Sequence, residues 1–204
     1  TAVRADSASG TVPIRVGEPL SLEDVVEVAA GAEVALGSGA LGRIGAARDV
    51  VERAVASNAT VYGVTTGFGS LANERIEPQQ ADALQLGIVR SHATAVGPPL
   101  SREEARAMLL LRAHVLALGH SGVRAEVVER MVEMLNRDLV PVVPQQGSLG
   151  ASGDLAPLAN LALPLVGRGE LLIDGQPKPA ADVLRSAGLE PLERLRGLGF
   201  SPEA

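Results

Sequence analysis

The sequence lacks cysteine and has almost no aromatic side chains. The absence of cysteine excludes disulfides, thiolate metal ligands and a cysteine nucleophile. Aromatic residues make up 1% of the chain and are Tyr62, Phe68 and Phe200. Hydrophobic residues still reach 46% of the 204 residues, enough for a sizeable core that must be built from Leu, Val, Ile and Ala. Such a residue set favours the packing of helix on helix.

Basic residues are neither in excess nor clustered. The chain has 18 Lys and Arg against 24 Asp and Glu, a net charge of −6, and both signs are mixed along its length. We therefore expect no nucleic acid partner. The longest apolar stretches are interrupted by Arg112 or Pro164, and no signal peptide is evident, so we expect a cytoplasmic protein without membrane contact. The three histidines lack the spacing of metal ligands, and we expect no metal.

Hydrophobic periodicity predicts a mainly α-helical protein with a few short strands and glycine-rich loops. Serine followed three residues later by an acid, at Ser21 and Ser101, predicts a helix start, and Asp174-Gly175 is typical of a hairpin turn. Helices are expected over 21–31, 42–58, 78–94, 101–119, 125–139, 154–166 and 180–187, extended segments over 11–16, 60–62 and 141–144, and a hairpin over 169–177.

Both ends of the chain have a sequence pattern that predicts their structure. Residues 1–12 are rich in Ala, Ser, Thr and Gly and are expected to form a flexible leader. Residues 201–204, Ser-Pro-Glu-Ala, have the pattern of a helix start. We therefore expect that the chain is cut there, the alternative being a frayed tail.

The most informative segment is residues 147–159, GSLGASGDLAPLA. Because Gly153 has no side chain, its amide nitrogen can approach the carbonyl carbon of Ala151 and close a five-membered ring. Loss of water, including the Ser152 hydroxyl, would leave a methylidene on an imidazolone, an electrophile that needs no bound cofactor. Asp154 stands beside this tripeptide at a helix N-terminus, where its charge is favoured. The spacing fits neither a dinucleotide or phosphate loop nor a nucleophile elbow; a plain glycine linker is the alternative.

This run resembles the signature of the ammonia-lyases and aminomutases that use methylidene-imidazolone as their prosthetic group. The resemblance implies that Ala151, Ser152 and Gly153 form this group, and that Gly150, Asp154 and Leu155 support it. It also implies a fold, the helical N-terminal domain of the fumarase/aspartase-like ammonia-lyases. Residues 13–204 would be this domain, truncated before the central helical bundle.

A second segment of the same resemblance is residues 61–69, VYGVTTGFG. In the family this is a loop whose tyrosine is the catalytic base, which implies that role for Tyr62 and places Gly69 near the substrate. A lone tyrosine outside such a loop is more often structural. Thr65 stands where the family often has Asn.

The third segment contains Ser91 and His92, at a position where the family sets substrate choice. The Ser-His pair resembles the histidine lyases and implies that both residues bind substrate. A histidine satisfied within its helix is an equally weighted alternative. Asn160 stands where many relatives have His, a departure that bears on the substrate.

The resemblance implies elimination of ammonia from L-histidine to give trans-urocanate, in histidine catabolism, by a homotetramer whose sites combine several subunits. The prosthetic group would activate the substrate, and Tyr62 would remove its β-proton. Two alternatives remain: a non-catalytic truncated or split fragment that only folds and self-associates, and a tyrosine or phenylalanine lyase or aminomutase. The isolated chain is expected to be incomplete and inactive.

Overall fold

The computed structural model describes residues 12–57, 59–67, 86–149 and 154–192. Most of these residues are helical, which confirms the expected fold class. The helices are α1 (Leu22–Ala30), α2 (Ala40–Ala56), α4 (Arg102–Ala117), α5 (Ala125–Asn136), α6 (Leu155–Ala162), η2 (a 3-10 helix, Leu163–Val166) and α7 (Ala180–Ser186). Residues 86–92 are also helical. The strands are β1 (Ile14–Val16), β2 (Val34–Leu36), β3 (Val96–Pro99), β4 (Val140–Pro141), β5 (Pro144–Gln146), β6 (Glu170–Ile173) and β7 (Gln176–Pro179).

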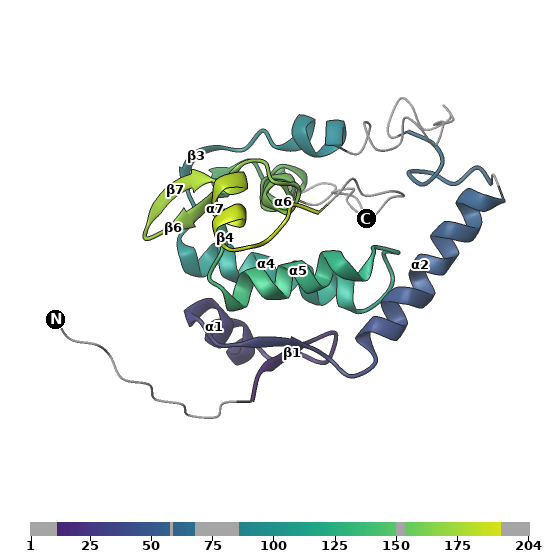
Figure 1. Ribbon diagram of the computed structural model, residues 1–204, viewed down its shortest axis with the longest axis horizontal. Helices are drawn as coiled ribbons and strands as arrows, with labels where there is room; N and C mark the ends of the chain where they lie inside the picture. Colours follow the sequence, from purple (N-terminus) through teal and green to yellow (C-terminus); the bar gives the residue numbers. More distant parts are fainter. Residues whose placement is uncertain (1–11, 58, 68–85, 150–153, 193–204) are drawn as a thin grey trace.

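Helices α4 and α5 pack on each other at the centre of the molecule (Figure 1). On one side, α1 packs against α4, and the parallel pair β1–β2 contacts α4 and α5. On the other side lie α6, the hairpin β6–β7 and α7, while α2 runs along the edge of the molecule. Aliphatic side chains and methionines fill the centre; the largest fully buried ones include Leu109, Leu110, Met131, Met134, Leu161 and Leu165.

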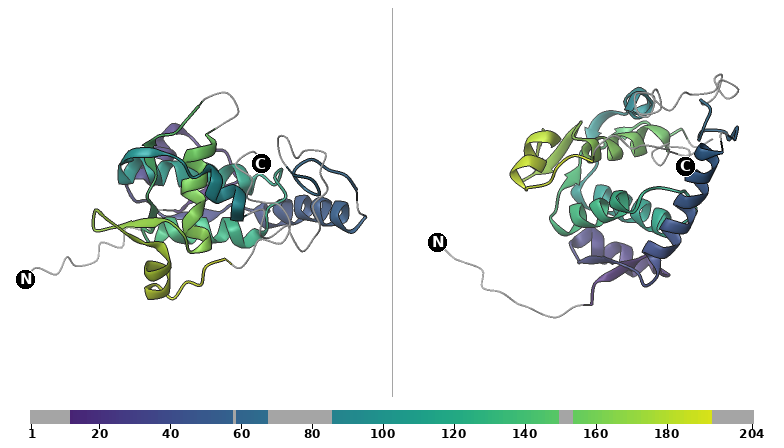
Figure 2. Two further views of the ribbon diagram at one scale, coloured as in Figure 1. Left: turned by 90° about the horizontal axis from the view of Figure 1, so that it is seen from above. Right: turned by 45° about the vertical axis from the view of Figure 1, so that its right-hand side comes forward.

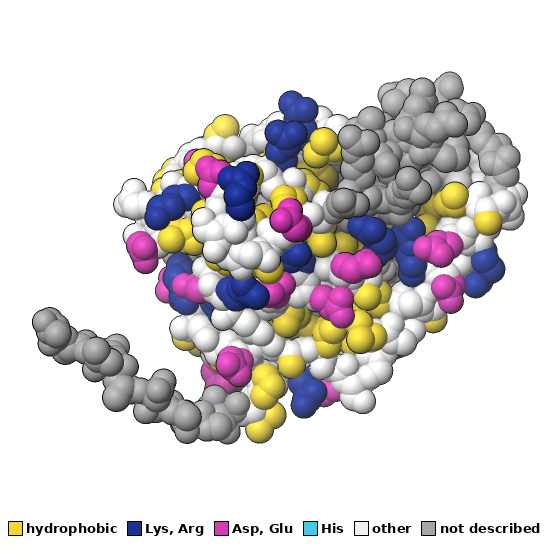
Figure 3. All heavy atoms as spheres, in the orientation of Figure 1, with side chains coloured by type: hydrophobic (Ala, Val, Ile, Leu, Met, Phe, Trp, Pro, Cys, Tyr) yellow, Lys and Arg dark blue, Asp and Glu magenta, His cyan; other side chains and the backbone are white. Residues whose placement is uncertain are grey.

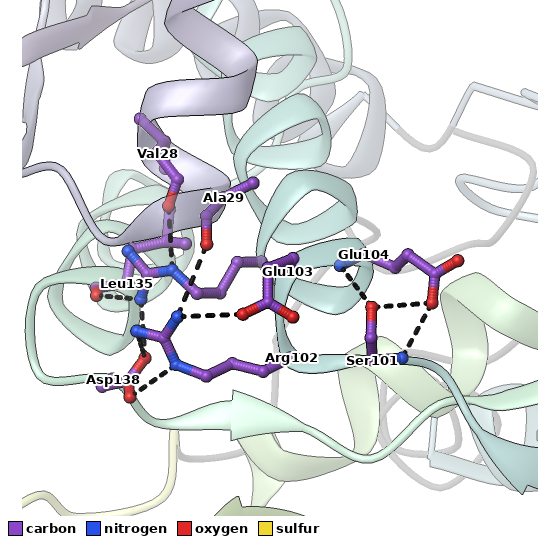
Figure 4. Close-up of polar contacts among 9 residues, drawn as sticks. Val28, Ala29, Ser101, Arg102, Glu103, Glu104, Leu135 and Asp138 are labelled. Atoms are coloured by element: carbon purple, nitrogen blue, oxygen red, sulfur yellow. Dashed lines mark hydrogen bonds and ion pairs between the residues drawn. The ribbon is translucent and has the colours of Figure 1, made fainter.

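The predicted helix starts at Ser21 and Ser101 are confirmed by two capping boxes. The Asp24 amide donates to the Ser21 hydroxyl over 3.1 Å, and the Ser21 amide donates to the Asp24 carboxylate over 2.8 Å. Ser101 and Glu104 repeat this pattern (Figure 4). Hydrogen bonds from the serines lower the pKa of both Asp24 and Glu104. These helix ends are therefore fixed by residues three positions apart, which is why the sequence predicts them.

The predicted hairpin is present as β6 and β7, and β4 pairs with its first strand. Asp174 and Gly175 both have positive φ, 53° and 74°, as the tight primed turns of hairpins require. The helix expected over 154–166 ends as an α-helix at Ala162 and continues as η2. Pro164 lies in that 3-10 turn and has no amide hydrogen to continue the α-helical pattern.

Three expectations need correction. Residues 60–62 were expected to be extended, but a turn begins at Tyr62. The helix expected over 78–94 ends, in its described part, at residue 92, and strand β3 follows. Strand β2 was not expected, and the Asn136 side chain holds it through 2.9 Å bonds to the amide and carbonyl of Val34. Residues 1–11 and 201–204, where we expected a leader and a helix start, lie outside the described residues.

A buried arginine joins three helices. Arg106 on α4 is 1% exposed and donates to the carbonyls of Val28 and Leu135 over 2.9 and 2.8 Å, at the ends of α1 and α5. It also pairs with Asp138, which in turn binds Arg102 at the surface (Figure 4). The guanidinium thus adds a second donor to carbonyls at two helix ends, where the regular i→i+4 bonding stops.

The surface mixes charges of both signs. On the face drawn in Figure 3, acidic and basic side chains are interspersed with small apolar areas. Within the part of the chain that the structure describes, no helix is both long and apolar enough to cross a bilayer.

Candidate active site

The antiparallel pair β3–β5 joins two of the three segments that the sequence singles out. Val96 pairs with Gln146 and Pro99 with Pro144. The residues that precede β3 therefore lie against those that follow β5. A Cβ on Gly147 would stand 2.7 Å from the Cβ of Ala95 and 3.2 Å from the Cβ of Ala156 on α6. Only glycine fits at this meeting point of three segments without a shift of its neighbours.

His92 is half-buried near the end of the helical segment 86–92. Its Nδ1 lies 2.8 Å from the carbonyl oxygen of Ile88. A carbonyl can only accept, so Nδ1 carries the proton. In the neutral ring Nε2 then holds the lone pair and can accept a hydrogen bond from a ligand. The intrahelical contact therefore orients the imidazole rather than occupying both of its nitrogens.

Ser91 is exposed, and its hydroxyl donates to the same Ile88 carbonyl over 3.0 Å. The hydroxyl also lies 3.2 Å from Nδ1 of His92. Its proton is thus committed to the helix backbone. Its oxygen adjoins the His92 ring, and the expected contact of Ser91 with substrate stays a prediction.

Asp154 is the N-cap residue of α6, but its side chain makes no capping bond to that helix. Its Oδ1 instead accepts a hydrogen bond from the hydroxyl of Ser148. Leu155 follows as the first residue of α6 and is half-buried. The expected residues Gly150, Ala151, Ser152 and Gly153 lie outside the described residues, as does Gly69.

Tyr62 lies on a turn that two threonine hydroxyls brace. The Thr65 hydroxyl accepts from the Val61 amide over 2.9 Å and donates to the carbonyl of Ala59 over 2.5 Å. The Gly63 amide donates to the Thr66 hydroxyl over 3.3 Å. Both threonines are buried, whereas the Tyr62 side chain is 55% exposed. The turn therefore holds the phenol at the surface.

The structure brings together two of the expected site segments and leaves the third apart. The helical segment 86–92 lies beside α6 in every view of the ribbon (Figures 1 and 2). The turn of Tyr62 follows the far end of α2 and stands away from α6 in Figure 1. Within this one chain, the helical segment 86–92 and α6 thus belong to the same region, and the turn of Tyr62 belongs to another.

The described surroundings fit a prosthetic group formed from residues 151–153. The close packing at Gly147 fixes the chain three residues before Gly150, and α6 fixes it directly after Gly153. The tripeptide itself supplies every atom that the ring needs: an amide nitrogen, a carbonyl carbon and a hydroxymethyl group. Within the described ranges, no three His, Asp or Glu side chains gather as metal ligands would.

Sequence reasoning missed three residues of this region. The sequence gives Gly147 no role beyond its place in the segment 147–159, and it assigns none to Ser148 or Thr65. Ser148 stands six residues before Asp154, and no local pattern relates two residues at that separation. Thr65 did have a signal, because Ser and Thr hydroxyls often bond the backbone of their own turn.

Solved structures place the fold in the class of ammonia-lyases and aminomutases. The tyrosine aminomutase from Streptomyces globisporus matches with a TM-score of 0.83 and 38% identity over 91% of this chain and 35% of its own. Histidine ammonia-lyase from Trypanosoma cruzi matches with a TM-score of 0.81 and 37% identity over 94% of this chain and 36% of its own.

The model of the aromatic amino acid lyase family matches residues 20–197, and the chain belongs to that family. A curated relative, histidine ammonia-lyase of Symbiobacterium thermophilum, is 51% identical over 180 residues, 88% of this chain. The histidine ammonia-lyase of Geobacillus thermodenitrificans is 57% identical over 145 residues, 71% of this chain and 29% of its own length. The chain spans about 36% of the length of the Symbiobacterium relative.

Proposed function

We propose that residues 13–204 are the prosthetic-group-bearing part of an ammonia-lyase that converts L-histidine to trans-urocanate and ammonia. The observation that carries this proposal is the junction of β3 and β5, where the segment after His92 lies against the segment that leads to Ala151-Ser152-Gly153. The family match and the identity of about half to curated histidine ammonia-lyases support the same reaction. We assign the reaction to cytoplasmic histidine breakdown.

The prosthetic group is made from the chain's own atoms. The Gly153 nitrogen attacks the Ala151 carbonyl carbon, and the carbonyl oxygen leaves as water. A second water takes the Ser152 hydroxyl and its α-hydrogen. Both steps are dehydrations and need no oxidant. The completed methylidene-imidazolone supplies an electrophile that withdraws electrons from the bound amino acid and so eases loss of ammonia.

The remaining steps fall to side chains. Nε2 of His92 accepts a hydrogen bond from an N–H of the substrate imidazole, with the ring held by the Ile88 carbonyl. Tyr62 takes the β-proton at its phenolic oxygen. A general base must lie within hydrogen-bond reach of the proton that it removes. Since the turn of Tyr62 stands apart from α6 in one chain, we propose that another copy of the protein supplies it, in a homotetramer.

A tyrosine-specific lyase or aminomutase is the second candidate. Its support is the 38% identity to the solved tyrosine aminomutase. Against it stands the Ser91-His92 pair, which resembles the corresponding pair of the histidine lyases. A third candidate, a fragment that folds without turnover, is supported by the share of the relatives' length that this chain spans.

The test uses the complete native polypeptide that contains this chain. The purified protein is offered histidine, tyrosine and phenylalanine, and both ammonia and the unsaturated acid are quantified. Release of urocanate from histidine, with slower or no reaction of the other two, is the expected result. A preference for tyrosine, or a β-amino acid product, would replace the proposal by the second candidate. Turnover of histidine by the isolated 204-residue chain would exclude the third candidate.

A further inference from the structure

The N-terminus of α6 uses its cap residue in an unusual way. An aspartate at an N-cap normally accepts a hydrogen bond from an amide in the first turn of its own helix. Asp154 occupies the N-cap but makes no such bond. Its carboxylate accepts from the Ser148 hydroxyl instead. The side chain is therefore directed back toward the residue that precedes the stretch 149–153.

Ser148 is itself held from its N-terminal side. It follows Gly147, whose packing against Ala95 and Ala156 leaves no room for a side chain. Before that, β5 pairs with β3, and the Gln145 side chain donates to the Pro99 carbonyl over 3.3 Å. Both partners of the Ser148–Asp154 bond thus stand on fixed elements, one after β5 and one at the start of α6.

We propose that Ser148 is a positioning residue for ring closure, acting through Asp154, and that their hydrogen bond sets the separation between the two ends of the stretch 149–153. The inference rests on the proposed function, because it presumes that the Gly153 nitrogen closes on the Ala151 carbonyl carbon. The two waters lost contain the Ala151 oxygen and the Ser152 hydroxyl. Neither Ser148 nor Asp154 loses an atom.

The physical reason is the entropy of closing a short loop. Fixing the geometry of two reacting groups accelerates an intramolecular step, here the attack of a nitrogen on a carbonyl carbon two residues away. A hydroxyl that donates to a carboxylate makes a stronger bond than one between neutral groups. Ser148 and Asp154 are both exposed in this chain, so water competes for the bond. We therefore expect its loss to slow ring closure rather than to abolish it.

The experiment follows ring formation itself rather than turnover. Ser148→Ala and Ser148→Thr are made in the complete native polypeptide, and loss of two waters is followed by intact-mass spectrometry after synthesis. We expect Ser148→Ala to mature at least about tenfold more slowly, the effect of a barrier raised by ~1.4 kcal/mol. Ser148→Thr keeps the hydroxyl and should mature within about twofold of the parent, a barrier change of only ~0.4 kcal/mol.

A double-mutant cycle tests whether the two residues act through one bond. Asp154→Ala should slow maturation as Ser148→Ala does, and the double variant should be no slower than the slower single variant. Asp154→Asn retains an oxygen that accepts from Ser148 and should mature faster than Asp154→Ala. Ser186→Ala is the matched control, because Ser186 also hydrogen-bonds through its hydroxyl, to the Asp182 carbonyl on α7. It should mature at the parent rate.

The outcomes separate this inference from the proposed function. Failure of the unsubstituted polypeptide to lose two waters would overturn both. If Ser148→Ala matures at the parent rate, the positioning role alone is overturned. The same holds if the double variant is slowed by the product of the two single effects, because the two residues would then act independently. Far-ultraviolet circular dichroism and the melting temperature of each variant are measured beside the mass. If Ser148→Ala and Ser148→Thr both mature slowly and both melt at a lower temperature than the parent, the positioning role is also overturned.

Discussion

The strongest structural prediction concerns Arg106, and its size follows from the contacts of that side chain. Arg106→Met removes bonds to the carbonyls of Val28 and Leu135 and to the carboxylate of Asp138, at 2.8–2.9 Å. Both carbonyls keep a second donor, the amides of Gly31 and Asp138, so neither is left without a partner. Each lost bond then costs about 1 kcal/mol, and the total is about 3 kcal/mol of unfolding free energy.

Arg102→Met is the matched control, because Arg102 pairs with the same carboxylate over 2.8 Å. Its side chain is 33% exposed against 1% for Arg106. The environments also act oppositely on the two guanidinium groups. Burial lowers the pKa of Arg106, whereas the hydrogen bond to Asp138 raises the pKa of Arg102. A pair at the surface contributes about 1 kcal/mol or less, so Arg102→Met should be the milder change.

Thermal unfolding by circular dichroism compares the two variants with the parent chain. For a chain of this length 1 kcal/mol shifts the melting temperature by roughly 2–4 °C. We expect Arg106→Met to lower it by roughly 6–12 °C and Arg102→Met by roughly 2–4 °C or less. An equal decrease in melting temperature in the two variants would refute the reasoning, because the burial of Arg106 and its bonds to two backbone carbonyls would then make no measurable contribution to stability.

Three further predictions concern single side chains. The Gly17 amide donates to Nδ1 of His114 over 3.2 Å, and burial lowers the pKa of that imidazole; the unfolded chain therefore binds the proton first, and stability should fall as pH drops through the ordinary histidine range. His114→Asn keeps an acceptor and should flatten this dependence in melting curves at several pH values; an unchanged slope would contradict it. Tyr62→Phe in the complete native polypeptide should abolish turnover, while the mass spectrum still shows that two waters have left. Ser152→Ala should abolish both turnover and this mass change. Full activity in either variant would exclude the role assigned to that residue. Thr65→Val removes the hydroxyl that braces the turn of Tyr62, and should lower kcat while leaving the mass change intact; unaltered kcat would mean that the turn needs no brace.

Local chemistry made much of the secondary structure predictable. The capping boxes at Ser21 and Ser101 and the turn at Asp174-Gly175 involve residues at most three positions apart, so the sequence displays all the groups that interact. The helix expected over 125–139 is present as α5, and all of its buried residues are apolar, as an amphipathic helix requires. The motif of residues 147–159 indicated the family by resemblance, and the family match agrees with it.

The sequence does not predict which distant segments pair as strands. Strand β1 pairs with β2 some twenty residues later, and β3 pairs with β5 across α4 and α5. Strands β3 and β5 contain proline and carry no strand signal of their own, and nothing local indicates which segment either of them, or β1, pairs with. The same holds for Arg106, which the sequence presents as one more charge on a helix.

The sequence by itself determined where most helices begin and that the core is aliphatic, because each of these depends on neighbours along the chain, and its resemblance to the ammonia-lyases predicts which tripeptide cyclises. Only the tertiary structure decided that the segment of His92 adjoins the approach to this tripeptide, that Ser148 meets Asp154, and that Tyr62 lies elsewhere. The reason is that these relations depend on how the elements pack in space: β3 and β5 are separated along the chain by α4 and α5, and even the separation of six positions between Ser148 and Asp154 exceeds the reach of a local pattern.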